Sequence, residues 1–120
     1  MNTALTNKIA LVTGASSGFG RSFCKTLAAE GASVIAVARR EALLQSLVEE
    51  IEAQGGKASA LALDVSDAKA VTAAFDGLED IRIVVNNAGV AGPSTAIDCE
   101  EDEWRWTYDV NVHAAWFVSR

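Results

Sequence analysis

Hydrophobic residues along the chain fall alternately into short continuous runs and longer stretches with helical spacing. Four continuous runs are typical of strands buried on both faces, at residues 8–13, 33–38, 58–63 and 81–85. Three intervening stretches carry apolar residues at helical spacing and predict helices, at residues 18–30, 41–54 and 67–78. Strand and helix therefore alternate up to the fourth run.

Particular apolar residues carry the helical spacing of the first two predicted helices. In the first helix the apolar positions are Phe19, Phe23, Leu27 and Ala28. In the second helix they are Leu43, Leu44, Leu47, Val48 and Ile51. Gly31 and the Gly55-Gly56 pair end these two helices. Residues 100–120, first acidic and rich in Trp and then apolar, predict further helices.

Alternating strands and helices with strands this apolar indicate a parallel sheet. Helices would cover both of its faces through right-handed crossovers. We therefore predict an α/β fold with a Rossmann-like doubly wound parallel sheet of about four strands and flanking helices. The length of 120 residues suits one small domain, residues 1–120.

Composition narrows the classes of protein to which the chain could belong. Half of its residues are hydrophobic and one is proline, which indicates a folded globular protein. A net charge of −6 with scattered Lys and Arg argues against a nucleic-acid partner. Cys24 and Cys99 form no CxxC pair, so we expect no metal site and a cytoplasmic location. No run of about 18 apolar residues is present, so we expect no membrane partner.

Residues 13–20 form a glycine-rich segment between the first predicted strand and helix, Thr13-Gly14-Ala15-Ser16-Ser17-Gly18-Phe19-Gly20. Gly14 permits a tight turn, Gly18 lets backbone N–H groups approach a phosphate, and Gly20 lets the helix pack closely on the strand. The positive end of the helix then faces the anion. This pattern predicts a site for the pyrophosphate of a dinucleotide cofactor.

Two other interpretations of this segment are weaker. The glycines could form a turn without a ligand, but strand, turn and helix stand in the order that a phosphate site needs. A P-loop requires Lys and then Ser or Thr directly after its last glycine, and here Arg21 follows Gly20. Mononucleotide kinase chemistry is therefore unsupported.

The end of the second predicted strand indicates which dinucleotide is bound. An NAD-binding site places Asp or Glu about twenty residues after the glycines, where it binds the ribose 2′-hydroxyl. This chain has Ala38 there, followed by Arg39 and Arg40. A guanidinium at this place would pair with a 2′-phosphate. We therefore expect NADP(H) rather than NAD(H), the alternative being two solvated arginines at a helix start.

The motifs of the chain resemble, in order, those of the short-chain dehydrogenase/reductase family over nearly the whole sequence. They are the glycine segment, Asp64-Val65 after the third predicted strand, Asn86-Asn87-Ala88-Gly89 after the fourth, and Asn111 seven residues after Trp104. The resemblance implies an oxidoreductase that transfers hydride between NADP(H) and a small-molecule carbonyl or alcohol substrate.

The resemblance also implies roles for individual residues. Asp64 would receive the adenine amino group and Val65 would support the ring, the alternative for Asp64 being a turn or helix-capping aspartate. Residues 86–89 would stabilise the sheet and contact the cofactor ribose. Asn111, the single catalytic candidate, would kink its helix and hold a water of a proton relay, the alternative being an ordinary buried Asn. The expected cofactor-binding residues are Thr13, Gly14, Ser16, Ser17, Gly18, Phe19, Gly20, Ala38, Arg39, Arg40, Asp64, Val65, Asn87, Ala88, Gly89 and Val110.

The family's catalytic Ser and its Tyr-x-x-x-Lys have no match in the 120 residues. Tyr108, the only tyrosine, is followed four positions later by Val112, so we expect it to pack rather than to act in catalysis. In the family, Lys lowers the pKa of that Tyr, which then moves the proton. We interpret the chain as an apparently truncated cofactor-binding half of an oxidoreductase, inactive by itself.

Two alternatives to that interpretation stay open. The chain could be a non-catalytic dinucleotide-binding module that self-associates into a homo-oligomer through its sheet edge and aromatic residues, namely Trp104, Trp106, Trp116 and Phe117. In a longer protein the same aromatic residues would serve core and helix packing. The fold could also be a flavodoxin-like regulator that binds a different anion.

Overall fold

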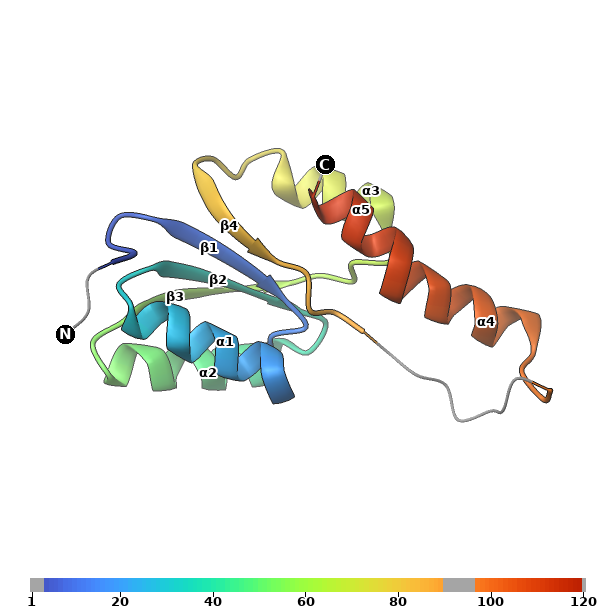
Figure 1. Cartoon of the computed structure of the whole chain (residues 1–120), viewed down its shortest axis with the longest axis horizontal. Helices are drawn as coiled ribbons and strands as arrows, with labels where there is room; N and C mark the ends of the chain where they lie inside the picture. Colours follow the sequence, from blue (N-terminus) through green and yellow to red (C-terminus); the bar gives the residue numbers. More distant parts are fainter. Residues whose placement is uncertain (1–3, 90–96, 120) are drawn as a thin grey trace.

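The computed structural model of the chain describes residues 4–89 and 97–119. The strands within these residues are β1 (Ile9–Thr13), β2 (Ser33–Ala38), β3 (Lys57–Ala62) and β4 (Ile81–Val85). The helices are α1 (Gly18–Ala29), α2 (Glu41–Ala53), α3 (Ala68–Phe75), α4 (Glu101–Tyr108), the π-helix η1 (Asp109–His113) and α5 (Ala114–Ser119). Strand and helix alternate up to β4, as predicted (Figure 1).

The strands form one parallel sheet in the order β3-β2-β1-β4. Leu11 of β1 pairs with Ile35 of β2 on one side and with Val84 of β4 on the other. The order therefore reverses beside β1, since the chain runs outward to β3 and then returns to the far side of β1. Open α/β sheets bind ligands at such a reversal, outside the carboxyl ends of the strands. The predicted doubly wound, Rossmann-like fold is confirmed.

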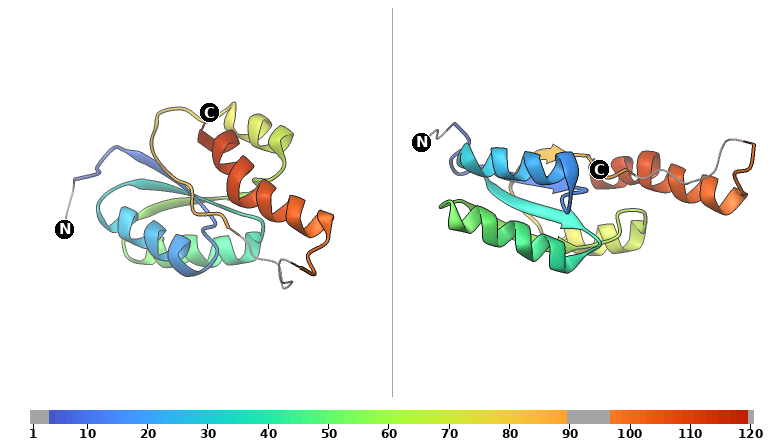
Figure 2. Two further views of the ribbon diagram at one scale, coloured as in Figure 1. Left: turned by 45° about the vertical axis from the view of Figure 1, so that its right-hand side comes forward. Right: turned by 90° about the horizontal axis from the view of Figure 1, so that it is seen from below.

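Helices pack on both faces of this sheet (Figure 2). On one face, α1 and α2 form a buried cluster with the strands that includes Val12 of β1 and Cys24 of α1. On the other face the buried cluster includes Leu11 of β1, Val71 of α3 and Val118 of α5. Successive residues of β1 thus face opposite layers, which explains why the inner strands β1 and β2 are apolar runs, whereas the outer strands β3 and β4 contain no buried residue.

Helices α4, η1 and α5 follow one another without a break and extend beyond the sheet (Figure 1). Ala114 and Val118 of α5 are buried in the core, and Val110 of η1 is also buried. Helix α4 has no buried residue. Its surface carries an ion pair one helical turn apart, with Arg105 Nη2 2.8 Å from Glu101 Oε1.

The apolar residues that indicated α1 are buried to different extents, since Ala28 is buried and Leu27 packs against the core while the two phenylalanines are exposed. Phe19 is 77% exposed and Phe23 is 39% exposed, and their rings stack on each other with centroids 6.2 Å apart. The buried residues of α1 are instead Gly20, Cys24 and Ala28, which recur every fourth position. These small residues let α1 lie close to the sheet. The large side chains of Phe19 and Phe23 therefore lie outside the buried face of the helix.

Smaller differences concern element boundaries. Helix α3 ends at Phe75 rather than at residue 78, and it begins after Asp67, whose carboxylate caps it by accepting the N–H of Ala70. Strand β3 covers residues 57–62 rather than 58–63. In α2, Leu43 is 37% exposed, whereas the rest of the predicted stripe is buried.

Candidate functional site

A cavity of about 430 Å³ lies at the carboxyl ends of the strands, where the segments after β1, β2, β3 and β4 converge. Its volume is within the range of small-molecule and cofactor sites. Most of the predicted cofactor-binding residues line it, namely Gly14, Ser16, Ser17, Phe19, Ala38, Arg39, Arg40, Asp64, Val65, Asn87, Ala88, Gly89 and Val110. The fold thus brings together motifs that are far apart in the sequence.

Some predicted residues do not line the cavity, and some lining residues were not predicted. The first group consists of Thr13, Gly18, Gly20 and Asn111. The second consists of Val37 and Leu63. Val37 lies near the end of β2 and Leu63 directly after β3, each immediately before a predicted residue. Because both side chains are apolar, the sequence suggests only a core role for them. Their positions beside Ala38 and Asp64 were the signal that could have identified them.

The glycine turn after β1 requires glycine for two different reasons. Gly14 and Gly18 have φ angles of +63° and +57°, a backbone conformation that side chains disfavour. Gly20 has ordinary backbone, but a Cβ atom there would overlap the carbonyl oxygen of Gly14. The position of a Cβ on Gly18, by contrast, has no atom within 4 Å. The turn therefore packs tightly at Gly20 and is open at Gly18.

The side chain of Thr13 ties the end of β1 to the segment after β4. Its Oγ1 accepts hydrogen bonds from the backbone N–H groups of Asn87 and Ala88, each at 3.0 Å, and donates to the Val85 carbonyl at 3.4 Å. The side-chain amide of Asn87 donates to the Gly14 carbonyl at 3.3 Å. Because Thr13 is buried, it joins two walls of the cavity rather than offering its hydroxyl to a ligand.

The first turn of α1 is open to an anion. Its N-cap residue Ser17 makes no side-chain hydrogen bond to the helix, and the first turn contains no acidic residue. Unpaired N–H groups at a helix start carry partial positive charge and bind phosphate. Ser16, Ser17 and Phe19 bring this helix start to the cavity wall. The turn therefore supplies backbone donors for a phosphate group.

Two arginines lie at the cavity directly after β2. Arg39 and Arg40 are exposed, and within residues 4–89 and 97–119 neither forms an ion pair. Arg21 and Lys25, by contrast, pair with Glu50 at 3.0 Å and 2.8 Å. The positive charge of Arg39 and Arg40 is therefore available to an anionic ligand.

Asp64 lies at the cavity and also shapes the turn after β3. Its Oδ1 accepts hydrogen bonds from the backbone N–H of Ser66 at 3.0 Å and from the Ser66 hydroxyl at 2.7 Å. Helix α3 is capped by Asp67 instead. Asp64 is thus a turn aspartate and not the helix cap, and it keeps an exposed position on the cavity wall.

Asn111 lies in the π-helix η1, where the wider turn interrupts α-helical hydrogen bonding. This irregularity coincides with the kink that the sequence resemblance implied. The Asn111 Oδ1 atom is 3.5 Å from where a Cβ on Gly89 would lie, so it neighbours a cavity-lining residue. Val110, the preceding residue, is buried and lines the cavity. The π-helix therefore borders the cavity on its β1–β4 side.

Tyr108 belongs to an aromatic group on the surface of α4 and η1. Its ring stacks on Trp104 with centroids 5.3 Å apart and meets the His113 ring edge-on at 4.9 Å. The Nδ1 atom of His113 is 2.9 Å from Asp109 Oδ1. Tyr108 does not line the cavity, which agrees with a packing role.

Other classes of site have little support in the described part of the chain. Among residues 4–89 and 97–119, no group of three or more His, Cys, Asp or Glu side chains is arranged to hold a metal ion. No described helix combines the length and the apolar character needed to cross a membrane. Cys24 and Cys99 are both free thiols.

Comparison with known proteins agrees with this geometry. A family profile described as short chain dehydrogenase matches residues 8–120. The chain is 44% identical to a short chain dehydrogenase of Pseudocercospora fijiensis, over 97% of this chain and 40% of that protein. It is 39% identical to a 3beta-hydroxysteroid dehydrogenase of Mediterraneibacter gnavus, over 94% of this chain and 43% of that protein. The chain thus spans less than half the length of these relatives.

Among solved structures, the fold matches a metagenomic short-chain oxidoreductase crystallised in complex with NADP. The TM-score is 0.88 at 32% sequence identity, and the match covers 95% of this chain and 54% of that one. The similarity therefore extends across the sheet, the glycine turn and the helices that border the cavity.

Proposed function

We propose that this chain, which belongs to the short chain dehydrogenase family, binds NADP(H) in the cavity at the carboxyl ends of its strands. The observation that carries the choice of cofactor is the pair Arg39 and Arg40, exposed at the cavity and without ion pairs in the described part of the chain. A guanidinium pairs in bidentate fashion with a phosphate, and NAD(H) has no phosphate on its 2′-oxygen. Family membership also argues against the flavodoxin-like alternative.

The residues around the cavity suit the separate parts of this cofactor. The open first turn of α1 offers backbone N–H groups to the pyrophosphate. Arg39 and Arg40 would hold the 2′-phosphate. Asp64 uses its Oδ1 atom for Ser66, and its second carboxylate oxygen would receive the adenine amino group. Gly14 and Gly20 have no side chain at positions where a Cβ atom would crowd neighbouring backbone atoms of the turn.

The distribution of charge indicates an orientation for the cofactor. The guanidinium groups of Arg39 and Arg40 follow β2. Gly89, Val110 and Asn111 border the cavity near β1 and β4. The adenosine end, which carries the extra phosphate, would therefore lie over β2 and β3. The nicotinamide end would extend toward Gly89 and Asn111, and when bound it supplies or accepts the hydride. Asn111 would there hold a water for proton transfer, as the family resemblance implies.

The reaction that we propose for the whole protein is hydride exchange between NADP(H) and a small-molecule carbonyl or alcohol. Residues 1–120 contain one tyrosine, Tyr108, which packs on Trp104 away from the cavity. General acid catalysis requires a titratable group within reach of the substrate oxygen. We therefore propose that these 120 residues supply cofactor binding, and we expect them to be inactive by themselves.

Self-association is a further part of the proposal. Trp104, Tyr108 and Trp116 of the helical segment α4-η1-α5 are 57%, 41% and 60% exposed, and Val84 is exposed on the outer strand β4. Exposed aromatic groups of this size favour a protein partner, and a second copy of the chain would bury them symmetrically. The side chain of Phe117 lies outside the described residues. Two free cysteines suit a cytoplasmic location.

Titration calorimetry of the purified chain with NADPH and NADH tests the proposed cofactor. The two molecules share every group except the 2′-phosphate, so their difference in affinity isolates the contribution of that phosphate. We expect NADPH to bind at least about tenfold more tightly, because a hydrogen-bonded charged pair contributes about 1.5–3 kcal/mol. The preference should shrink as salt is added. Equal affinities, or tighter binding of NADH, would contradict the proposal.

A further inference from the structure

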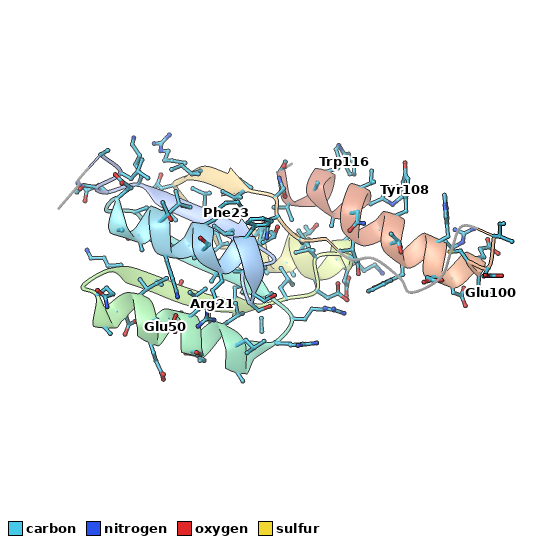
Figure 3. The ribbon with its side chains drawn as sticks, turned by 60° about the horizontal axis from the view of Figure 1, so that its bottom comes forward. Arg21, Phe23, Glu50, Glu100, Tyr108 and Trp116 are labelled. Atoms are coloured by element: carbon cyan, nitrogen blue, oxygen red, sulfur yellow. The ribbon has the colours of Figure 1, made fainter. Side chains whose placement is uncertain are left out.

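Arg21 of α1 contacts successive turns of α2 with a single guanidinium (Figure 3). Its Nη1 donates to the carbonyl oxygen of Leu43 at 3.3 Å. Its Nη2 donates to the hydroxyl of Ser46 at 3.3 Å and lies 3.0 Å from Oε2 of Glu50. The three acceptors follow one face of α2, so this side chain fixes the position of α2 against α1.

The same residue is part of the phosphate turn region. Arg21 directly follows Gly20, and its backbone N–H bonds to the carbonyl of the N-cap residue Ser17 at 3.4 Å. Its side chain is 21% exposed, so the guanidinium is largely enclosed between the helices. Arg21 therefore joins the helix that begins at the phosphate turn to the helix that begins after Arg40.

The C-terminal parts of the two helices border a groove. The groove, of about 810 Å³, is lined by Ala28 and Ala29 of α1 and by Ala53 of α2. The polar link at Glu50 lies at the edge of this groove, where Lys25 also approaches the carboxylate at 2.8 Å. The hydrogen bond from Lys25, aided by Arg21, holds the pKa of Glu50 below its ordinary value.

The position of α2 matters because Arg39 and Arg40 have no side-chain partners of their own in the described part of the chain. Arg40 is the N-cap residue of α2, and its side chain makes no capping hydrogen bond. Where these two guanidinium groups lie thus depends on where the backbone at the start of α2 is held. The Arg21 hydrogen bond to Leu43 holds the first turn of α2 from the side of α1, in addition to the burial of Leu44 in the core.

We infer that Arg21 is a positioning residue for recognition of the 2′-phosphate, acting through α2 on Arg39 and Arg40. The inference rests on the proposed function, since it assumes that these two arginines bind that phosphate. Arg21 itself does not line the cavity. Its removal should therefore loosen the arginine pair while leaving the phosphate turn and the pyrophosphate contacts in place.

The test is Arg21→Met, which keeps a long side chain and removes the guanidinium. We expect the Kd for NADPH to rise about fivefold to tenfold and the Kd for NADH to change less than about twofold, in the usual range for coupled neighbouring groups. Lys25→Met is the matched control, since Lys25 also contacts Glu50 but makes no contact with the first turn of α2. It should leave the ratio of the two constants unchanged.

Each outcome decides between the two proposals. If the unmodified chain shows no preference for NADPH, the proposed function fails. If that preference exists and Arg21→Met keeps it, or loses affinity for both cofactors equally, only the role of Arg21 is refuted. Should circular dichroism show that Arg21→Met is unfolded, Glu50→Gln releases one end of the same link. It should raise the Kd for NADPH about twofold to threefold and spare NADH, and an unchanged ratio would overturn the inference.

Discussion

The Oγ1 atom of Thr13 accepts a hydrogen bond from the backbone N–H of Asn87 at 3.0 Å, which joins the end of β1 to the segment after β4. Thr13→Val keeps the shape of the side chain but leaves the N–H groups of Asn87 and Ala88 without this acceptor. We expect the free energy of unfolding to fall by about 1–3 kcal/mol. Urea denaturation measures the loss. Thr13→Ser keeps the hydroxyl and should lose less than half as much, and equal losses would contradict this role.

Alanine at the glycines of the turn should have unequal effects. At Gly20 the new Cβ would overlap the Gly14 carbonyl oxygen, which the rigid backbone cannot easily avoid. Gly20→Ala should therefore cost more than about 3 kcal/mol or prevent folding. Gly18→Ala meets open space and costs only the left-handed backbone conformation, about 1–2 kcal/mol. Thermal denaturation followed by circular dichroism compares the two, and a larger loss for Gly18→Ala would refute this account of the turn.

The sequence predicts the fold well where periodicity and chemistry agree, and less well where small residues do the packing. The strand Ser33–Ala38 is a continuous apolar run because both faces of the sheet are covered, and its bounds match the prediction. A large apolar side chain such as that of Phe19 suggests burial, but Phe19 is exposed. The close contact of α1 with the turn is made by Gly20 instead. Packing distances between backbones, which decide such cases, are not encoded in the spacing of apolar residues.

The candidate site likewise contains features that the sequence can predict and others that it cannot. The position of Arg39 and Asp64 at the cavity could be predicted because charged residues directly after apolar runs are recognisable in the sequence. The contacts of Arg21 with α2 could not, since Leu43, Ser46 and Glu50 offer it a backbone carbonyl, a hydroxyl and a carboxylate that form no motif. Such a link depends on how two helices lie beside each other.

The stability of the chain should fall at alkaline pH because of Cys24. Burial raises the pKa of this thiol to about 11, and Arg21 nearby lowers it only in part. Above the ordinary thiol pKa of about 8.5, the unfolded chain loses a proton that the folded chain keeps. The contribution of Cys24 is therefore complete below that pH and is lost as the pH rises toward 11.

Cys24→Ala isolates this effect. Denaturation in urea at about pH 8 and about pH 10 should show a smaller loss of stability for the variant than for the unmodified chain, since the variant has no thiol to ionise at this position. Other groups that titrate in this range are common to both proteins and cancel in the comparison. Parallel losses would show that the thiol ionises as freely in the folded chain as in the unfolded one.

The 120-residue chain should not reduce carbonyl substrates even when NADPH is supplied. Its only tyrosine stacks on Trp104 and does not line the cavity, so no tyrosine hydroxyl in the chain is placed to give a proton to a substrate oxygen. Loss of NADPH absorbance in the presence of a panel of ketones and aldehydes measures this. Rates at the level of buffer alone are expected. Sustained turnover that disappears in Tyr108→Phe would show that the chain is catalytic.

We propose that Arg39 and Arg40 select NADP(H) by pairing with its 2′-phosphate. The ratio of the dissociation constants for NADPH and NADH, measured in the unmodified chain and in the double variant Arg39→Ala, Arg40→Ala, tests this pairing. We expect the variant to bind NADPH at least about tenfold more weakly and NADH with less than about twofold change. Equal losses for the two cofactors, or an unchanged affinity for NADPH, would contradict it.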